Sequence, residues 1–102
     1  MTRREKIEER LRDDPNDLFL NYSYAMELAK VADVAGARQA FQKVRSLDPN
    51  YVPAYFQEGQ MLAHAEEIEN AREILNQGIV IARQVRDDHA LAEMTDFLDS
   101  LS

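Results

Sequence analysis

The sequence contains no cysteine and few of the residues that break helices, with three glycines and three prolines in 102 residues. Without cysteine the chain can form no disulfide bond and has no thiolate for catalysis or metal binding. The scarcity of glycine and proline argues against a turn-rich β protein and favours long helices. The sequence also lacks the run of about 18 apolar residues that a membrane-spanning helix needs. Because no apolar run follows the basic residues after Met1, we expect no secretory signal and a cytoplasmic protein.

Basic residues are fewer than acidic residues. The chain has 12 Lys and Arg residues against 19 Asp and Glu, which gives a formal net charge of -7. Such a chain repels phosphate backbones and anionic lipid surfaces, so we expect neither a nucleic acid nor a membrane as partner. Solubility alone is a sufficient reason for the acidity. The hydrophobic share of 45% is ordinary for a folded domain, and the length predicts a single domain over residues 1–102.

Signals for chemistry are also scarce. No glycine-rich phosphate-binding loop occurs, and no serine or threonine lies in the sequence context of a catalytic nucleophile. His64 and His89 are each followed within four residues by a glutamate, but one histidine and one carboxylate are too few to hold a metal ion. Both are interpreted as surface histidines. The acidic run 66–69 suits the start of a helix, where the helix dipole attracts carboxylates. We therefore predict no catalytic residue, no cofactor and no metal, and not an enzyme.

An internal repeat organises the chain. Asp14-Pro15-Asn16 recurs 34 residues later as Asp48-Pro49-Asn50. At the same offset most matched positions are apolar or small, as helix packing requires. The matched pairs are Tyr22 and Phe56, Leu28 and Leu62, Ala29 and Ala63, Val34 and Ile68, Ala37 and Ala71, Arg38 and Arg72, Phe41 and Leu75, and Leu47 and Ile81.

Apolar residues recur at steps of three and four, which predicts an all-α protein. Pro49 should end one helix, because proline disfavours helical geometry in the residue before it, and Asn50 is expected to cap the next. Nothing in the sequence breaks the fifth helix before Asp87. The expected helices are residues 3–13, 17–31, 34–47, 51–65, 68–86 and 88–101.

A 34-residue period with proline near the end of the repeat resembles the tetratricopeptide repeat (TPR) family, and in particular small bacterial-type members. The residues that carry the resemblance are Tyr24, Ala25, Leu28, Ala37, Phe41 and Pro49 in the first repeat, and Gly59, Leu62, Ala71 and Leu75 in the second. Asn21, Glu58 and Arg83 depart from the family pattern. The resemblance implies an α-solenoid of antiparallel helix pairs, with repeats at residues 18–51 and 52–86.

The two ends of the chain lie outside the repeats. Residues 87–102 contain Leu91, Met94, Leu98 and Leu101 at helical spacing, so we expect a capping helix that covers the apolar face of the second repeat. Residues 1–15 are charged except for a few apolar positions, of which Ile7 and Leu11 lie one helical turn apart. A lightly docked helix and a frayed arm both fit this segment.

The resemblance places function on a concave face lined by the first helix of each repeat. Its expected partner-binding residues are Phe19, Tyr22, Met26 and Lys30 in the first repeat, and Pro53, Phe56, Gln60 and His64 in the second. The family's carboxylate-clamping positions hold Tyr22, Met26 and Gln57 here, which argues against binding of a peptide C-terminus. Aromatic and methionine side chains suit an apolar or amphipathic helix instead. We therefore predict an adaptor that binds a peptide or a partner helix.

Two alternatives stay open for these aromatic residues. Phe19 and Tyr22 could pack on the N-terminal helix through Ile7 and Leu11, since exposed aromatic patches are uncommon on monomers. The same surface could instead mediate self-association of a structural homodimer without a separate peptide ligand.

Overall fold

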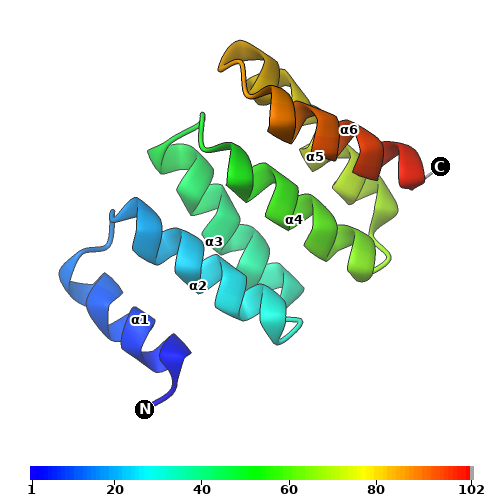
Figure 1. The fold of residues 1–102 in the computed structure, drawn as a ribbon. Coiled ribbons are helices and arrows are strands. Elements are labelled where there is room, and N and C mark those ends of the chain that lie inside the picture. The colour runs from blue at the N-terminus through cyan, green and yellow to red at the C-terminus, as the bar shows by residue number, and fades with distance from the viewer. Residues whose placement is uncertain (102) are drawn as a thin grey trace. The chain divides into compact units, whose positions relative to one another are not determined.

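The computed structural model describes residues 1–101, which form six α-helices and no strand (Figure 1). The all-α prediction is confirmed, and every helix lies within two residues of its predicted bounds. The helices are α1 (Arg3–Asp13), α2 (Leu18–Lys30), α3 (Val34–Leu47), α4 (Val52–His64), α5 (Ile68–Gln84) and α6 (Asp88–Ser100). The chain forms two compact units, Met1–Asp48 with α1 to α3 and Pro49–Ser102 with α4 to α6, and each is described by itself.

The 34-residue repeat is visible in the turns that follow α2 and α4. Ala32 and Glu66, 34 residues apart, both have a positive φ, of 61° and 62°. In each turn the residue after the positive-φ residue donates its backbone N–H to a carbonyl five residues back. Asp33 donates to Leu28 and Glu67 donates to Leu62, which is the Schellman arrangement. Glycine is the usual residue there, because a side chain strains this left-handed backbone. The repeated geometry therefore sits on two residues that give no sequence signal for it.

In both repeats a buried side chain of the following helix donates a hydrogen bond to the carbonyl of the repeat proline. Asn21 donates from Nδ2 to the carbonyl of Pro15 at 3.0 Å, and Tyr55 donates from its hydroxyl to the carbonyl of Pro49 at 2.7 Å. Asn21 and Tyr55 are 34 residues apart, and both are buried. Asn21 departs from the family pattern, yet its side-chain amide makes the hydrogen bond that the hydroxyl of Tyr55 makes in the second repeat, and so fixes the turn before the helix.

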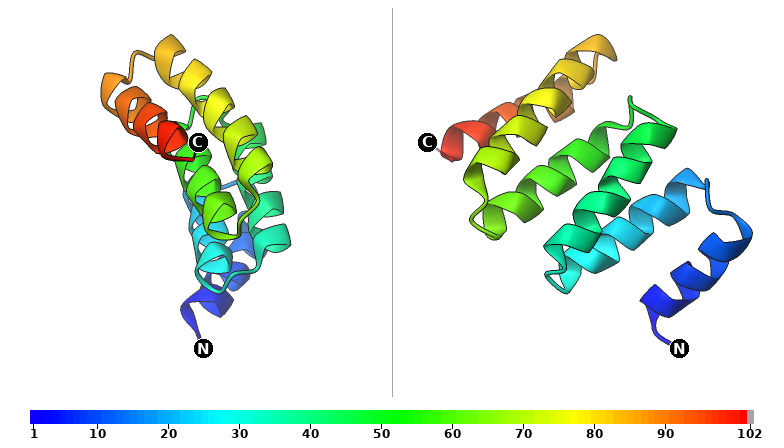
Figure 2. Two further views of the ribbon diagram at one scale, coloured as in Figure 1. Left: turned by 90° about the vertical axis from the view of Figure 1, so that its right-hand side faces the viewer. Right: turned by 180° about the vertical axis from the view of Figure 1, so that it is seen from behind.

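In the first unit α2 and α3 run antiparallel and share an apolar core (Figure 2). Asp17 and Asp33 cap the two helices, each accepting a hydrogen bond from a backbone N–H three residues on. Small residues allow the helices to pack closely, and Ala25 and Ala37 are completely buried, as are Phe41 and Val44.

Helix α1 is docked on α2, which decides between the two expectations for the N-terminal segment. Thr2 and Glu5 form a capping box that starts the helix. Ile7 is buried at 7% exposure, and two polar contacts reach α2. Arg3 pairs with Glu27 at 2.7 Å, and the hydroxyl of Tyr24 donates to Glu8 at 3.2 Å. The frayed-arm alternative is therefore wrong.

In the second unit α5 packs against both α4 and α6. A Cβ atom on Gly59 would lie 2.6 Å from the side chain of Leu75, so α4 and α5 approach as closely as their small residues predict. Gly78 lies where all three helices meet, because a Cβ there would be 2.6 Å from Tyr55 of α4 and 2.7 Å from Met94 of α6. Met94 is completely buried. Helix α6 therefore packs on α5 and α4 of the second repeat.

Two details of the sequence prediction are wrong. Asn50 is not the cap of α4, since the cap residue is Tyr51 and no side chain makes a capping hydrogen bond there. Pro53 in the first turn stabilises this start instead. Helix α5 ends at Gln84 rather than at residue 86, because Arg86 has a φ of 60° and closes a turn like those after α2 and α4. No helix within residues 1–101 has both the length and the apolar character needed to cross a membrane.

Candidate partner-binding site

The first set of predicted partner-binding residues lies on one face of α2, here called the α2 stripe: Phe19, Tyr22, Met26 and Lys30. Spacings of three and four residues keep them on that face. Phe19 is 70% exposed and Lys30 is exposed, whereas Tyr22 and Met26 are half-buried. The ring of Tyr22 packs edge-on against Phe41 of α3, with the centroids 6.4 Å apart. Phe41 therefore packs against the ring of Tyr22 from within the unit, while the ring of Phe19 remains exposed.

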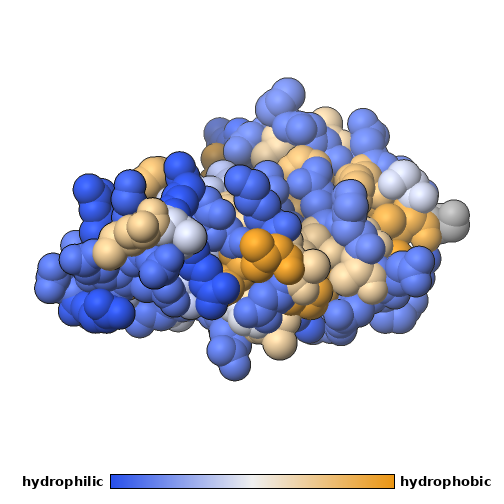
Figure 3. All heavy atoms as spheres, turned by 90° about the horizontal axis from the view of Figure 1, so that it is seen from below, coloured by the Kyte–Doolittle hydropathy of each residue, from blue (hydrophilic) through white to orange (hydrophobic). Residues whose placement is uncertain are grey.

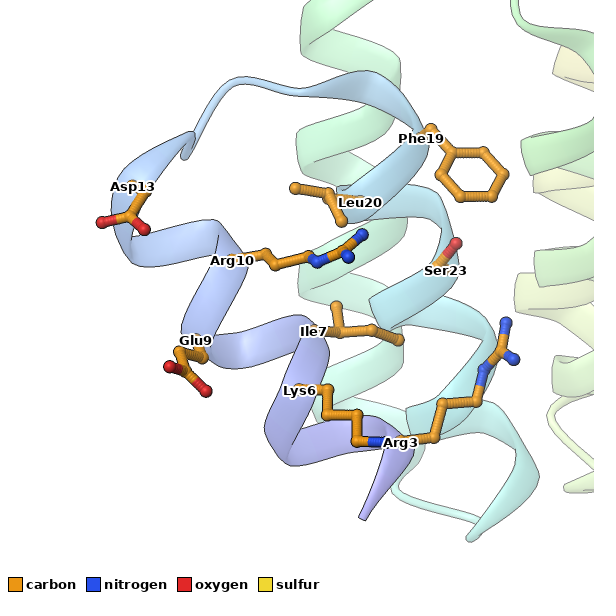
Figure 4. A pocket seen from close by; sticks show the side chains of 9 residues that line it. All are labelled: Arg3, Lys6, Ile7, Glu9, Arg10, Asp13, Phe19, Leu20 and Ser23. Atoms are coloured by element: carbon orange, nitrogen blue, oxygen red, sulfur yellow. The ribbon is translucent and has the colours of Figure 1, made fainter. Parts of the chain in front are cut away.

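Phe19 is 70% exposed, so α1 does not bury its ring, although Ile7 and Phe19 line the same cleft. Ile7 of α1 points towards α2 below Arg10, while the ring of Phe19 lies on the far side of α2 in this view (Figure 4). Leu11, the other apolar residue invoked, lines a separate cleft of about 410 Å³ that also contains Tyr24, Leu28 and Ala40. The aromatic ring of Phe19 thus stays in solvent within the first unit.

The second set of predicted residues lies on α4, here called the α4 stripe: Pro53, Phe56, Gln60 and His64. Pro53 and His64 are exposed, and Phe56 and Gln60 are half-buried. His64 makes a local hydrogen bond through Nδ1 with the carbonyl of Gln60 at 3.0 Å. The ring of Phe56 packs edge-on against Phe97 of α6, with 6.0 Å between centroids. Helix α6 therefore shares the surface of this stripe.

Phe97 is the residue that sequence reasoning missed. The apolar positions assigned to the last helix were Leu91, Met94, Leu98 and Leu101, which left Phe97 without a role. In the structure Phe97 is half-buried and lies against a predicted partner-binding residue, Phe56. The available signal was its spacing, because Phe97 follows Met94 by three residues and so lies beside it on the helix surface.

A cleft of about 470 Å³ lies between α1 and α2 (Figure 4). Three cations of α1 line it, and these are Arg3, Lys6 and Arg10. Their spacing places them on one face of the helix together with Ile7. Leu20, Ser23 and Phe19 line it from α2, and Glu9 and Asp13 lie at its outer edge. The cleft therefore combines an apolar floor with positive charge, in a chain that is acidic as a whole.

One carboxyl has a displaced pKa, at the start of α1. The backbone N–H of Thr2 donates to the carboxylate of Glu5 at 3.1 Å and is the main cause that lowers the pKa of that group, with the side chain of Thr2 as the second cause. Both histidines are exposed, as predicted, and His89 lies 2.7 Å from Glu93. Within residues 1–101 no three histidine, aspartate or glutamate side chains are grouped so that they could hold a metal ion. The displaced pKa belongs to a helix cap and marks no reactive centre.

On the face drawn in Figure 3, hydrophilic side chains cover most of the surface and apolar side chains show through in patches. The exposed large apolar residues of the chain include Phe19, Val31, Val80 and Val85. Within residues 1–101, Phe19 is the only aromatic side chain among these exposed residues. Such residues can contact another macromolecule, and aromatic residues contribute most to such contacts.

Neither a protein-family model nor a curated protein matches the sequence. Several solved structures share its fold. A Bordetella parapertussis protein solved in solution superposes with a TM-score of 0.87 at 21% identity, over 99% of this chain and 88% of the other. A tetratricopeptide repeat domain protein from Salinibacter ruber gives 0.77 at 27% identity, over 86% and 89%. The TPR2B domain of yeast Sti1, solved in a complex with pHsp70, gives 0.85 at 21% identity, over 96% and 78%.

Proposed function

The chain is a tetratricopeptide-repeat-type protein, and on this premise we propose that it is an adaptor that binds a peptide or a helix of a partner protein. The α2 stripe and the α4 stripe are its proposed contact residues. The Sti1 domain of the same fold forms a complex with pHsp70, which supports a protein or peptide as the class of partner. We further propose that the adaptor is cytoplasmic and carries out no catalysis.

The exposure of Phe19 is the observation that carries this proposal. A phenylalanine that is 70% exposed keeps most of its apolar surface in water, although the half-buried Tyr22 lies one turn away on the same face. Complete burial of such a side chain is worth about 1.5–3 kcal/mol. A partner that covered the ring would recover most of this free energy, and one aromatic anchor of that size is typical of a binding hot spot.

The chemistry of the stripes favours an apolar or amphipathic segment over a terminal carboxylate. Tyr22, Met26 and Gln57 occupy the clamp positions that the family resemblance assigns, and none of them carries positive charge. Methionine adapts its shape to irregular apolar surfaces, and aromatic rings supply large contact areas at small entropic cost. An amphipathic helix with an apolar face at three- and four-residue spacing would match each stripe.

The test uses a single substitution that spares the core. Phe19→Ser removes the exposed ring, while Val80→Ser removes an apolar side chain that is 50% exposed and lies outside both stripes. Tagged wild-type protein captures partners from a lysate, and mass spectrometry identifies them. Binding of a purified partner to each variant is then measured by calorimetry. We expect Phe19→Ser to weaken binding about tenfold or more and Val80→Ser to leave it within about twofold. Equal binding by all three proteins would refute the assignment.

Self-association is the second candidate that this experiment must separate. Light scattering on a sizing column, over a wide range of concentration, measures the mass in solution. The adaptor proposal expects a monomer throughout. A concentration-dependent dimer that Phe19→Ser abolishes would assign the α2 stripe to a homodimer interface instead.

A further inference from the structure

We propose that the cleft between α1 and α2 binds a peptide segment of a partner in which an apolar side chain is flanked by carboxylates. The inference rests on the proposed function, since it takes a protein to be the partner. The cleft would be a second contact surface beside the stripes, and its positive charge predicts that the bound segment of the partner is negatively charged. Of the cleft's residues, only Phe19 also belongs to the α2 stripe.

The cations of the cleft are not all used by the fold. Arg3 pairs with Glu27 of α2 at 2.7 Å. Within residues 1–101, the ammonium group of Lys6 and the guanidinium group of Arg10 have no carboxylate partner. Arg10 nevertheless extends across the cleft between Ile7 and Leu20, towards Ser23 (Figure 4). Two cations that face an apolar floor without a counter-charge would attract a carboxylate of an incoming segment.

The carboxylates at the edge of the cleft do not cancel this charge. Glu9 and Asp13 line the cleft as well, but their side chains point away from α2, to the outer side of α1 (Figure 4). Neither makes an ion pair with Lys6 or Arg10. The inner wall of the cleft is therefore positive, while the outer edge is acidic.

The rest of the cleft favours a peptide over a small anion. The floor consists of Ile7 and Leu20, and the volume of about 470 Å³ is in the range of pockets that hold an organic group. A bare anion would gain nothing from the apolar floor. A peptide can use both the apolar floor and the cations: one of its apolar side chains would pack on Leu20, and the carboxylates next to it would lie near Lys6 and Arg10.

Charge along the chain gives the same preference. Residues 1–48 contain nine basic and nine acidic side chains, whereas residues 49–102 contain three and ten. The whole net charge of -7 thus belongs to the second unit. An acidic peptide meets no net repulsion from the unit that contains the cleft.

The probe is a short fluorescein-labelled peptide with one leucine between two pairs of acidic residues, studied with the full chain. One control peptide has Gln and Asn in place of Glu and Asp, and another has Ser in place of Leu. Fluorescence anisotropy measures Kd, and amide shifts in ¹H–¹⁵N spectra locate the site. We expect the acidic leucine peptide to bind with a Kd below about 1 mM. We expect the largest shifts at Ile7, Leu20 and Ser23, and binding at least about fivefold weaker for each control peptide.

The matched variants reverse two charges on the same helix. Lys6→Glu with Arg10→Glu changes the cleft, and Arg4→Glu with Arg12→Glu makes the same change at positions that do not line it. We expect the first pair to weaken binding at least tenfold and the second to change it less than about threefold. Raising salt from about 50 to 500 mM should weaken wild-type binding as well, which tests the cleft even if a variant loses helicity.

Four results would overturn the inference: no binding below about 1 mM, equal binding of the amide peptide, equal loss in both double variants, or shifts outside α1 and α2. A mass increase with concentration that Lys6→Glu with Arg10→Glu abolishes would also overturn it, by assigning the cleft to a second copy of the chain. Phe19 belongs to both the α2 stripe and the cleft, so the two surfaces are separated by Lys6→Glu with Arg10→Glu, which changes the cleft and leaves both stripes intact. Loss of partner by Phe19→Ser without peptide binding in the cleft would leave the adaptor standing and remove this inference.

Discussion

Gly78→Ala tests the packing of α4, α5 and α6 most directly, because two opposing effects meet at this position. Alanine is favoured over glycine inside a helix by about 1 kcal/mol. At Gly78, however, the new methyl group would lie 2.6 Å from Cβ of Tyr55 and 2.7 Å from Sδ of Met94. Contacts between carbon atoms are comfortable near 3.5–4.0 Å, so both neighbours must move by about 1 Å.

The two neighbours differ in how easily they can move. Met94 is flexible, but it is completely buried and has little space to enter. Cβ of Tyr55 is attached to the backbone of α4 and can move only with that helix. Overpacking of this kind costs about 1–3 kcal/mol, which exceeds the gain in helix propensity. We expect Gly78→Ala to lower the free energy of unfolding by about 1–2 kcal/mol.

Gly36→Ala in α3 is the matched control. The methyl group there would lie close only to the carboxylate of Asp33, which caps α3 through the N–H of Gly36 and would have to shift. The gain in helix propensity is offset by a weaker cap, so we expect stability to change by less than about 1 kcal/mol. Urea unfolding followed by circular dichroism at 222 nm measures both variants. If Gly78→Ala raised stability, α4 and α6 would not approach α5 at Gly78, and the capping arrangement would be wrong.

Three further predictions concern the first unit. Phe41→Ala removes a completely buried ring and should cost about 3–5 kcal/mol, seen as a fall in Tm of at least about 12 °C; a negligible fall would contradict its place in the core. Ala32→Gly relieves a φ of 61° and should raise stability by up to about 1 kcal/mol in urea unfolding, whereas Ala92→Gly inside α6 should lower it by about as much. The carboxyl of Glu5 should titrate below its ordinary pKa in NMR spectra. Because its folded-state pKa is depressed, its stabilising contribution is present above the unfolded pKa and is lost as pH falls through the folded one; an ordinary titration would contradict the capping box.

Most of the fold could be predicted from the sequence, because the signals that set it are local and repeated. The 34-residue offset matched Leu18 with Val52 and Val34 with Ile68, and each of these residues begins a helix. Ala25, Ala37 and Gly59 belong to the repeat pattern, and in the structure these small residues are buried where helices pack closely. These features follow from backbone geometry and side-chain size within a few turns of helix.

The errors arose where a local signal had a competitor. Asn50 is a favourable capping residue, but Pro53 one turn later sets the start of α4 at Val52, and the helix begins without a side-chain cap. Arg86 carries no turn signal, yet it adopts the left-handed conformation that ends the turn after α5, because the chain must reverse for α6 to pack on α5. Tertiary packing thus overrides residue preference at both places.

The contacts of the candidate site were the least predictable part. Periodicity placed Tyr22 and Phe56 on helix faces correctly, but it could not show that Phe41 supports the first ring and Phe97 the second. Both contacts join different helices, so their geometry depends on how far apart the helices lie and on the rotamers of both residues. Neither quantity is encoded in the spacing along one helix.

The net charge of the whole chain does not describe the charge of one surface. The value of -7 was used to exclude anionic partners as though the charge were evenly spread. Residues 1–48 are in fact neutral, and three of their nine basic residues converge on one cleft. Exposed charges interact over about 10 Å at ordinary salt, so a segment that docks beside Lys6 and Arg10 responds to these side chains more than to the total. The composition of the chain therefore limits which partners approach it at long range, while the proposal assigns the choice among them to the face of α1.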